Sequence, residues 1–579
     1  MNPSSQRPLL NYSLLFLIIN FFLCPSVFSS APSGDKYGGE LILATTSDPK
    51  SFNDIVASET STSAITSKIF EGLTTVDPFT LKTLPLLAER WDHNEDGLIW
   101  TFYLRKDVTW FDGVPFTADD VVFTFNDLIY NPDIPNPAKD IFTIDERVFK
   151  VEKIDTFTVR FTLPVKFAPF LKGMGQSILP KHKLEKAVQE KKFVFTWGID
   201  TPTQEIVGTG PFRLKEYRPG ERIILQKNPT YWKFSDEGER LPYLEKIIYL
   251  IVQNQDASIL KFIDGELDSI SLRGSDFPLV KPLEKKKNFT VYDAGPDFGS
   301  NFITFNQNPR LNPKNGKPFV DPIKLSWFSN IHFRQAVAHA IDKNKIIEII
   351  ENGLGYPQYS QMSPSAGFFY NPNVVKYDYD LTKAKQILTD AGFIDRNGNG
   401  ILEDPQGHEI EFNLFTNSGA VERVQIASII RNDLQKLGMK VNFNAIEFNV
   451  LVAKLTSSWD WEAIILGLTG GVEPHFGKNV WDSKGGLHMW SPKQEAPQTE
   501  WETRVNEIFS AGAQELDEDK RKVLYDEFQV IVSKELPLVY TVLGSDLYAI
   551  RNKFGNLKPS SVSGAWHNLE SIYILKEYR

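Results

Sequence analysis

The sequence is almost without cysteine. Among 579 residues there is one, Cys24, at the end of an apolar N-terminal stretch. If residues 1–30 are removed as a secretory leader, the remaining chain has no thiol, which excludes a disulfide, a thiolate zinc site and a cysteine nucleophile. A chain of this length buries enough apolar surface to be stable without cross-links. Lipidation of Cys24 is the alternative, although the preceding Phe22 and Leu23 are poor context for it.

Long apolar runs are also scarce. The only one follows Arg7, spans residues 9–23 and ends near the small residues Ser29 and Ser30. This order is typical of a signal peptide, so we expect residues 1–30 to be a leader and the mature chain to be periplasmic. No later stretch approaches the roughly 20 apolar residues that a membrane-spanning helix needs. A retained membrane anchor is the weaker alternative.

Positive charge is not in excess, and recognised catalytic motifs are missing. The formal net charge is −10, which argues against a nucleic-acid surface. The sequence contains no Gly-x-Ser-x-Gly elbow, no Gly-Lys-Ser/Thr phosphate loop and no His-Glu-x-x-His pair. We therefore expect a binding protein that is not an enzyme. A secreted hydrolase with an unrecognised site is the rival class.

Strands and helices alternate in the last third of the chain. Residues 409–415, 439–443 and 463–466 have the composition of buried strands, and helices are predicted between them over residues 421–437 and around 450–455. A further helix is predicted earlier in the chain, over residues 333–352. The alternation predicts a largely parallel sheet with right-handed crossovers. Ligands of open α/β sheets bind outside the carboxyl ends of the strands. The residues that follow these strands are therefore expected to border a binding crevice.

Two loops are expected to border this crevice from the same side. Thr416 and Asn417 follow the first strand, and a glycine-rich loop follows the third. Glycine lets the backbone turn sharply and lets a ligand approach closely. The loop residues are Leu468, Thr469, Gly470 and Gly471, with Glu473 directly after them. A tight turn without a ligand is the alternative for the loop, and capping of the next turn is the alternative for Glu473.

Five stretches, taken together and in chain order, resemble the family 5 bacterial extracellular solute-binding proteins, the peptide- and nickel-binding receptors of ABC importers. The similarity runs from about Gly39 to the C-terminus. The stretches are SFNDIVASETSTSAITSKIFEGL (51–73), WTFYLRKDVTWFDGVPFTADDVV (100–122), GTGPFRLKEYRPGERIILQKNPTYW (208–232), FRQAVAHAIDK (333–343) and YDLTKAKQILTDAG (379–392). The resemblance implies a protein that captures di- or oligopeptides outside the cytoplasmic membrane. A nickel chelate or a sugar as ligand, or a ligand-sensing role, is the alternative.

The resemblance implies a periplasmic binding protein-like α/β fold (type II, cluster C), with two main lobes and a smaller inserted lobe around a ligand cleft. Lobe I would combine residues 31–70, 203–295 and 536–579, lobe II would be residues 71–202, and lobe III residues 296–535. The ligand would be enclosed by hinge closure, and permease subunits of the transporter would recognise the closed form. The implied partners are thus a peptide or other small molecule and the permease, and we expect a monomer.

The resemblance also adds residues to the predicted site. Extended peptides would be held through their main chain, much as an added strand is. Dipeptide receptors of the family often have Trp and Asp where this chain has Leu468 and Gly471, which leaves Glu473 as the alternative anchor for a peptide amino terminus. The contacts carried over by position, besides the two loops, are Ser58, Glu59, Thr60 and Asn301.

One stretch is similar to the opening of a calcium-binding loop. Oxygen-bearing side chains stand at its first, third and fifth positions, glycine at the sixth, a backbone carbonyl at the seventh and Glu403 at the ninth. The twelfth position is Gln406, where such loops have a bidentate glutamate. The candidate ligands are Asp395, Asn397, Asn399, the Ile401 carbonyl and Glu403. A structural Ca²⁺ is one interpretation and a polar hairpin loop the other, and no cofactor is required.

His475 and His488 flank the predicted cleft. Histidine nitrogens bind nickel, so a nickel or nickel-chelate ligand is conceivable. Neither residue belongs to a recognised spacing of metal ligands. We therefore favour histidines that hold no metal.

Overall fold

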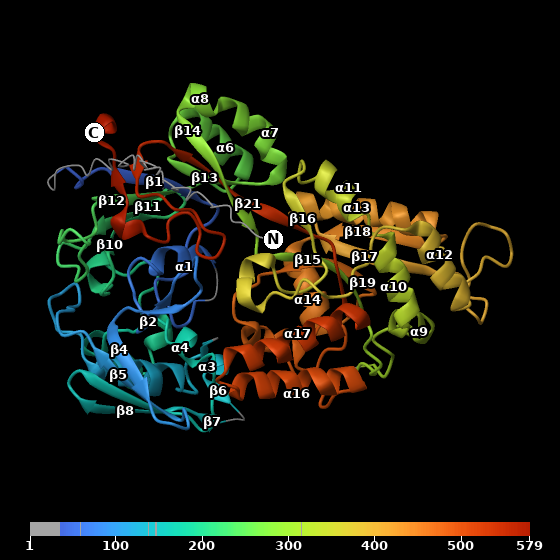
Figure 1. Ribbon diagram of the computed structural model, residues 1–579, viewed down its shortest axis with the longest axis horizontal. Coiled ribbons are helices and arrows are strands. Elements are labelled where there is room, and N and C mark those ends of the chain that lie inside the picture. Colours follow the sequence, from blue (N-terminus) through green and yellow to red (C-terminus); the bar gives the residue numbers. More distant parts are fainter. Residues whose placement is uncertain (1–34, 58–59, 137, 145–146, 314) are drawn as a thin grey trace, which may run out of the picture.

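The computed structural model describes residues 35–579, except residues 58–59, 137, 145–146 and 314. The predicted leader and the predicted contacts Ser58 and Glu59 lie outside the described residues. Among the described residues, no helix is long and apolar enough to cross a membrane. Figure 1 shows lobe I at the upper left, lobe II at the lower left and lobe III on the right.

Lobe I is built from strands that are far apart in the sequence. One sheet has the order β1-β12-β11-β10, with β1 parallel to β12, and a second sheet has the order β13-β21-β14. Gly220 has a φ of +68° in the turn between β10 and β11, where glycine is the least strained residue. The strands are β1 (Glu40–Thr45), β10 (Phe212–Arg218), β11 (Arg222–Lys227), β12 (Lys246–Ile251), β13 (Ser269–Leu272), β14 (Phe289–Pro296) and β21 (Val542–Arg551). The helices are α1 (Thr60–Thr66), α6 (Gln255–Asp264), α7 (Phe277–Val280) and α8 (Glu284–Lys287).

Lobe II contains an antiparallel sheet of order β4-β5-β9-β8. Its buried side chains, such as Phe102 and Phe161, belong to the same apolar cluster as Leu41 and Ile247 of lobe I. The two lobes therefore share one hydrophobic core. The sheet strands are β4 (Ala88–His93), β5 (Ile99–Leu104), β8 (Lys150–Asp155) and β9 (Thr158–Thr162), and the hairpins are β2 (Thr74–Val76) with β3 (Thr83–Pro85) and β6 (Thr143–Ile144) with β7 (Arg147–Val148). The helices are α2 (Ala118–Phe123), α3 (Ala138–Ile141), α4 (Phe170–Gly173) and α5 (Lys181–Gln189).

Lobe III is organised around a sheet of order β18-β17-β19-β15-β20. β20 falls within residues 536–579, which were expected in lobe I, but it pairs with β15 of this sheet. β17 is parallel to both β18 and β19, whereas β15 is antiparallel to β19 and β20. Side chains alternate across β19, so that Ala463 and Ile465 join one buried cluster and Ile464 and Leu466 join another. The predicted apolar strand is thus buried on both faces. The strands are β15 (Ser300–Phe305), β17 (Glu411–Asn417), β18 (Lys440–Ile446), β19 (Ala463–Leu468) and β20 (Leu538–Tyr540).

Helices cover both faces of the lobe III sheet. The single helix predicted over residues 333–352 is wrong, because the backbone leaves the helical region at Ile341, with φ −87° and ψ 108°. The Asp342 side chain accepts a hydrogen bond from the Lys345 amide and starts a second helix. The helices are α9 (Pro322–Ser329), α10 (Ile331–Ala340), α11 (Lys343–Ile349), α12 (Leu381–Asp390), α13 (Val421–Lys436), α14 (Phe448–Ala453), α15 (Lys478–Trp481), α16 (Glu500–Gln514) and α17 (Glu518–Glu535).

The chain passes between lobes I and III at one edge of the lobe III sheet. β14 leads into β15, and β20 leads into β21, which is the long red strand between the two lobes in Figure 1. Since β15 is antiparallel to β19, its first residue, Ser300, lies opposite Leu468, the last residue of β19. β17 ends at the same edge because it is parallel to β19. The two predicted strand ends therefore share the edge from which the chain crosses to lobe I.

Candidate ligand-binding site

A cavity of about 320 Å³ lies at this edge of lobe III. The loop after β19 forms part of its wall. A Cβ atom at Gly470 would lie 2.3 Å from the Phe298 carbonyl oxygen, so only glycine fits there. At Gly471 nothing lies within 4 Å of an added Cβ, so that position is open. The predicted site residues that line the cavity are Leu468, Thr469, Gly470, Gly471 and Glu473.

Thr416 and Asn417 are the last two residues of β17 and do not follow it. The strand begins and ends two residues later than predicted. Thr416 is fully buried, and its hydroxyl donates to the Ile465 carbonyl oxygen at 2.9 Å. Its polar group is therefore used inside the sheet, between β17 and β19.

Arg423 on α13 is a charged residue at this edge that the sequence reasoning missed. Its Nε donates to Oδ1 of Asn301 at 3.0 Å, and its Nη1 donates to Oδ1 of Asn417 at 2.6 Å. Burial lowers the pKa of Arg423, and neighbouring Glu422 partly opposes that shift. The two predicted asparagine contacts therefore hold a cation in place. Arg423 could have been predicted as a site residue because it lies in the first turn of a helix that begins beside the crevice.

Glu473 is buried between two cations. Its carboxylate accepts from Arg521 at 2.6 Å and lies 3.4 Å from Nζ of Lys172. Burial alone would raise the pKa of Glu473, but Arg521 and Lys172 outweigh it and lower the pKa. The side chain also accepts from the His475 amide, which is the capping role considered as the alternative. The hypothesis that Glu473 is a free anionic anchor for a peptide amine therefore conflicts with this geometry.

Lys172 belongs to α4, so its contact with Glu473 joins lobe II to lobe III. Two further contacts lie beside it: the Ala168 amide donates to the Ala513 carbonyl oxygen at 2.7 Å, and the Phe167 and His475 rings lie 5.3 Å apart, edge to face. Figure 1 shows α16 next to the lower left lobe. The wall of the cavity is thus physically connected to lobe II through Glu473.

The two histidines that were considered as nickel ligands have other roles. Burial lowers the pKa of His475 to about 4, so its ring is neutral near pH 7. His488 is fully buried, and its Nε2 lies 3.3 Å from Oε1 of Glu502. Within the described ranges there is no group of three or more histidine, cysteine or acidic side chains suited to a metal ion.

Lobe I carries a second cavity, of about 370 Å³. It is lined by the residues after β1, by Thr60 at the start of α1 and by Tyr548 of β21. The Tyr548 hydroxyl donates to Asp546 at 2.6 Å. Burial raises the pKa of Asp546 to about 6, with a further increase from Asp297 and Asp293. A carboxylate that does not itself line the cavity is thus hydrogen-bonded to the neutral hydroxyl of a lining tyrosine.

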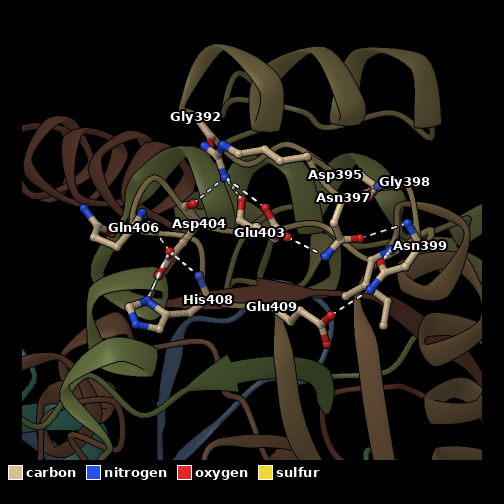
Figure 2. Close-up of polar contacts among 12 residues, drawn as sticks. Gly392, Asp395, Asn397, Gly398, Asn399, Glu403, Asp404, Gln406, His408 and Glu409 are labelled. Atoms are coloured by element: carbon tan, nitrogen blue, oxygen red, sulfur yellow. Dashed lines mark hydrogen bonds and ion pairs between the residues drawn. The ribbon is translucent and has the colours of Figure 1, made fainter.

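The calcium-like stretch forms a compact surface loop (Figure 2). The two carboxylate oxygens of Asp395 accept from the Gly398 and Gly400 amides at 2.8 and 2.9 Å. The Asn397 amide donates to Glu403 at 2.6 Å, and the Arg396 guanidinium lies 3.6 Å from the same carboxylate. The oxygen donors for a hard cation are thus present, but Glu403 is already engaged within the loop.

Three lobes, with a cavity at the edge of lobe III from which the chain crosses to lobe I, define a solute-binding protein architecture. The profile of the bacterial extracellular solute-binding proteins, family 5, matches residues 82–486. The chain therefore belongs to this family, and the resemblance inferred from five motifs is confirmed.

Individual relatives agree with this assignment. A probable ABC transporter-binding protein of Deinococcus radiodurans is 31% identical over 536 residues, which cover 88% of this chain and 87% of that protein. The oligopeptide-binding protein AppA of Bacillus subtilis is 28% identical over 473 residues, or 78% of this chain and 80% of AppA. The solved structure of AppA with a nonapeptide has a TM-score of 0.73 at 24% identity, covering 93% of this chain and 100% of that one. The predicted fold class is confirmed.

Proposed function

We propose that this protein is the solute-binding component of an ABC importer and that it captures peptides. The observation that carries the proposal is the cavity walled by residues 468–471, at the edge of lobe III from which the chain crosses to lobe I. A relative 28% identical in sequence is an oligopeptide-binding protein, which supports a peptide as the ligand. The protein performs no chemistry on its ligand.

Hinge motion between lobes I and III would couple binding to delivery. A ligand shifts an equilibrium between open and closed forms only if it binds the closed form better. A peptide that touches cavity walls on both lobes meets this condition, because opening breaks one set of contacts. Residues 297–299 and Thr541, which connect strands of the two lobes, are short enough to act as hinges.

We place the mature protein outside the cytoplasmic membrane, as a monomer that docks on permease subunits. The family consists of bacterial extracellular solute-binding proteins, which supports this location. Size-exclusion chromatography with light scattering should give one chain per particle. A stable dimer would contradict the monomer.

The direct test is native mass spectrometry of the purified protein, followed by calorimetry with a peptide pool, a galactoside and a nickel–histidine chelate. We expect peptides to bind and to be recovered intact; cleaved peptides would favour the hydrolase class. The Gly471→Trp variant should weaken peptide binding at least tenfold, because that position is open and lines the cavity. Gly486→Trp is the control, since Gly486 is equally open but lies outside this cavity. Binding of the sugar or chelate alone would overturn the peptide assignment.

A further inference from the structure

The lobe III cavity has a largely apolar wall. It is formed by side chains from α15, α17 and β20 together with the segment after β16 (Gly355–Pro357). Its size falls within the range of small-ligand pockets and is far above the roughly 10–15 Å³ that one water molecule requires. Five of the apolar lining residues are Met362, Val480, Trp481, Phe528 and Leu538. An occupant with an apolar surface would be favoured because it replaces water against these groups.

The cavity offers no free charge to an occupant. Of the described residues that line it, Glu473 is the only ionisable acid or base that is charged near pH 7. The Glu473 side chain is 1% exposed and its carboxylate is paired with Arg521 and Lys172. An ammonium group placed in this cavity would lose its hydration and gain no unpaired carboxylate, and a carboxylate would gain no unpaired cation. Charged occupants are therefore disfavoured.

Gln361 supplies one polar feature of this wall. Its Oε1 accepts from the Ser360 hydroxyl at 3.1 Å, whereas its Nε2 is buried and has no hydrogen-bond partner among the described residues. A buried donor without a partner destabilises the fold, and such atoms are few in native proteins. Gln361 lines the cavity, so rotation of its side-chain amide can bring this donor to an acceptor on a bound molecule. A peptide carbonyl oxygen has the required chemistry.

We propose that the lobe III cavity binds an uncharged, apolar side chain of the captured peptide, and that Gln361 donates to a carbonyl oxygen next to it. The inference rests on the proposed peptide-binding function and specifies its substrate class. It also assigns specificity to the apolar cavity wall and not to Glu473, because the Glu473 carboxylate pairs with cations of the protein and does not bind a peptide amine. The receptor thus selects peptides by a bulky apolar residue.

The test is calorimetry with alanine hexapeptides in which one residue is replaced, at each position in turn, by Leu, Phe, Glu or Lys. At one position we expect Leu or Phe to bind about ten- to a hundredfold more tightly than Glu or Lys, the range that burial of one apolar side chain gives. Peptides that bind equally well whatever the substitution would overturn the inference and leave the peptide receptor standing. If none of the peptides bound, the proposed function would fail, and the inference with it.

Variants locate the effect in this cavity. Phe476→Ala should reduce the preference for Leu or Phe, because Phe476 lines the cavity and is 43% exposed. Phe448→Ala is the matched control, with 51% exposure on α14 and no place in the cavity wall. Asn479→Asp adds a carboxylate to the wall without changing its size and should shift the preference toward Lys. An unchanged preference in both Phe476→Ala and Asn479→Asp would contradict the assignment to this cavity.

Gln361→Met tests the hydrogen bond separately. The substitution keeps the length of the side chain and removes its donor. We expect all peptides to bind several-fold more weakly, with the preference for an apolar residue intact. Affinities equal to wild type would remove Gln361 from the proposal.

Discussion

Two carboxylates near the walls of the two cavities differ in what surrounds them. Glu473 of lobe III is buried, but Arg521 and Lys172 lower its pKa and keep it charged. Burial raises the pKa of Asp546 of lobe I to about 6; the hydrogen bond from the Tyr548 hydroxyl lowers it, and Asp297 and Asp293 raise it further. Burial acts in the same direction at both residues. At Glu473 the neighbouring cations outweigh burial, whereas at Asp546 the neighbouring acids add to it, so the sign of the neighbouring charges decides the direction of the pKa shift.

The different surroundings of Glu473 and Asp546 show that a carboxylate in a predicted binding loop need not contact the ligand. Glu473 stands in a glycine-rich loop where an anionic anchor was expected, yet its charge is used to join lobe II and lobe III. The lobe III wall is thereby left without an unpaired charge. Four experiments test the contrast, and they follow from the largest expected effect to the smallest.

The Glu473→Gln variant should lose about 3–5 kcal/mol in the free energy of unfolding, the usual cost of removing one partner of a buried ion pair. The reason is that Arg521, whose side chain is 3% exposed, keeps its charge and loses its anion. Urea denaturation followed by fluorescence measures this change. The Glu473→Gln/Arg521→Met double variant should recover much of the loss. A single-variant loss below about 1 kcal/mol would show that the pair contributes little.

The Asp546→Asn variant should alter the dependence of stability on pH. The folded pKa of Asp546 is raised to about 6 from an ordinary value of 3.8, so between these values the folded state binds more protons than the unfolded chain. This residue therefore makes stability fall as pH rises from about 4 to 6, by up to about 3 kcal/mol and by less where solvent screens this partly exposed group. Asparagine cannot titrate and should remove that fall. Equal pH profiles of the wild type and the variant, from urea denaturation, would contradict the raised pKa.

The Lys172→Met variant should weaken peptide binding about fivefold, which corresponds to roughly 1 kcal/mol for a partly exposed ion pair. Lys172 reaches Glu473 from lobe II, so its loss disfavours the arrangement in which lobes II and III touch. Calorimetry measures the affinity. Lys166→Met, at an exposed lysine on the same lobe, should bind like the wild type. An unchanged affinity in Lys172→Met would limit the contact to a structural role.

The smallest effect is expected at the surface loop that contains Asp395, where the half-buried carboxylate accepts hydrogen bonds from amides of its own loop. Calcium at this loop stays a prediction. If the ion binds, 1 mM CaCl₂ should raise the melting temperature by about 1 °C relative to chelator, equivalent to roughly 1 kcal/mol for a chain of this length. Asp395→Asn should abolish the rise. No shift and no heat in calorimetry would leave the polar hairpin loop.

Much of the fold could be predicted from local pattern. The apolar run at residues 463–466 predicted a buried strand, and the alternation of strands and helices placed the ends of β17 and β19 at one edge. The break at Ile341 was missed because residues 333–352 are apolar at helical spacing on both sides of it. The end of β17 was missed because Thr416 and Asn417 are polar, and their burial depends on Ile465 and Arg423.

The sequence by itself determined the family, the order of the elements and the glycine-rich loop, because spacing, composition and motifs are local properties of the chain. Only the tertiary structure decided which charges are free. Glu473 meets Lys172 across 301 positions and Arg521 across 48. No local pattern encodes such distant pairs, yet they set the charge of the cavity wall, because the interaction between two ions depends on their separation in space.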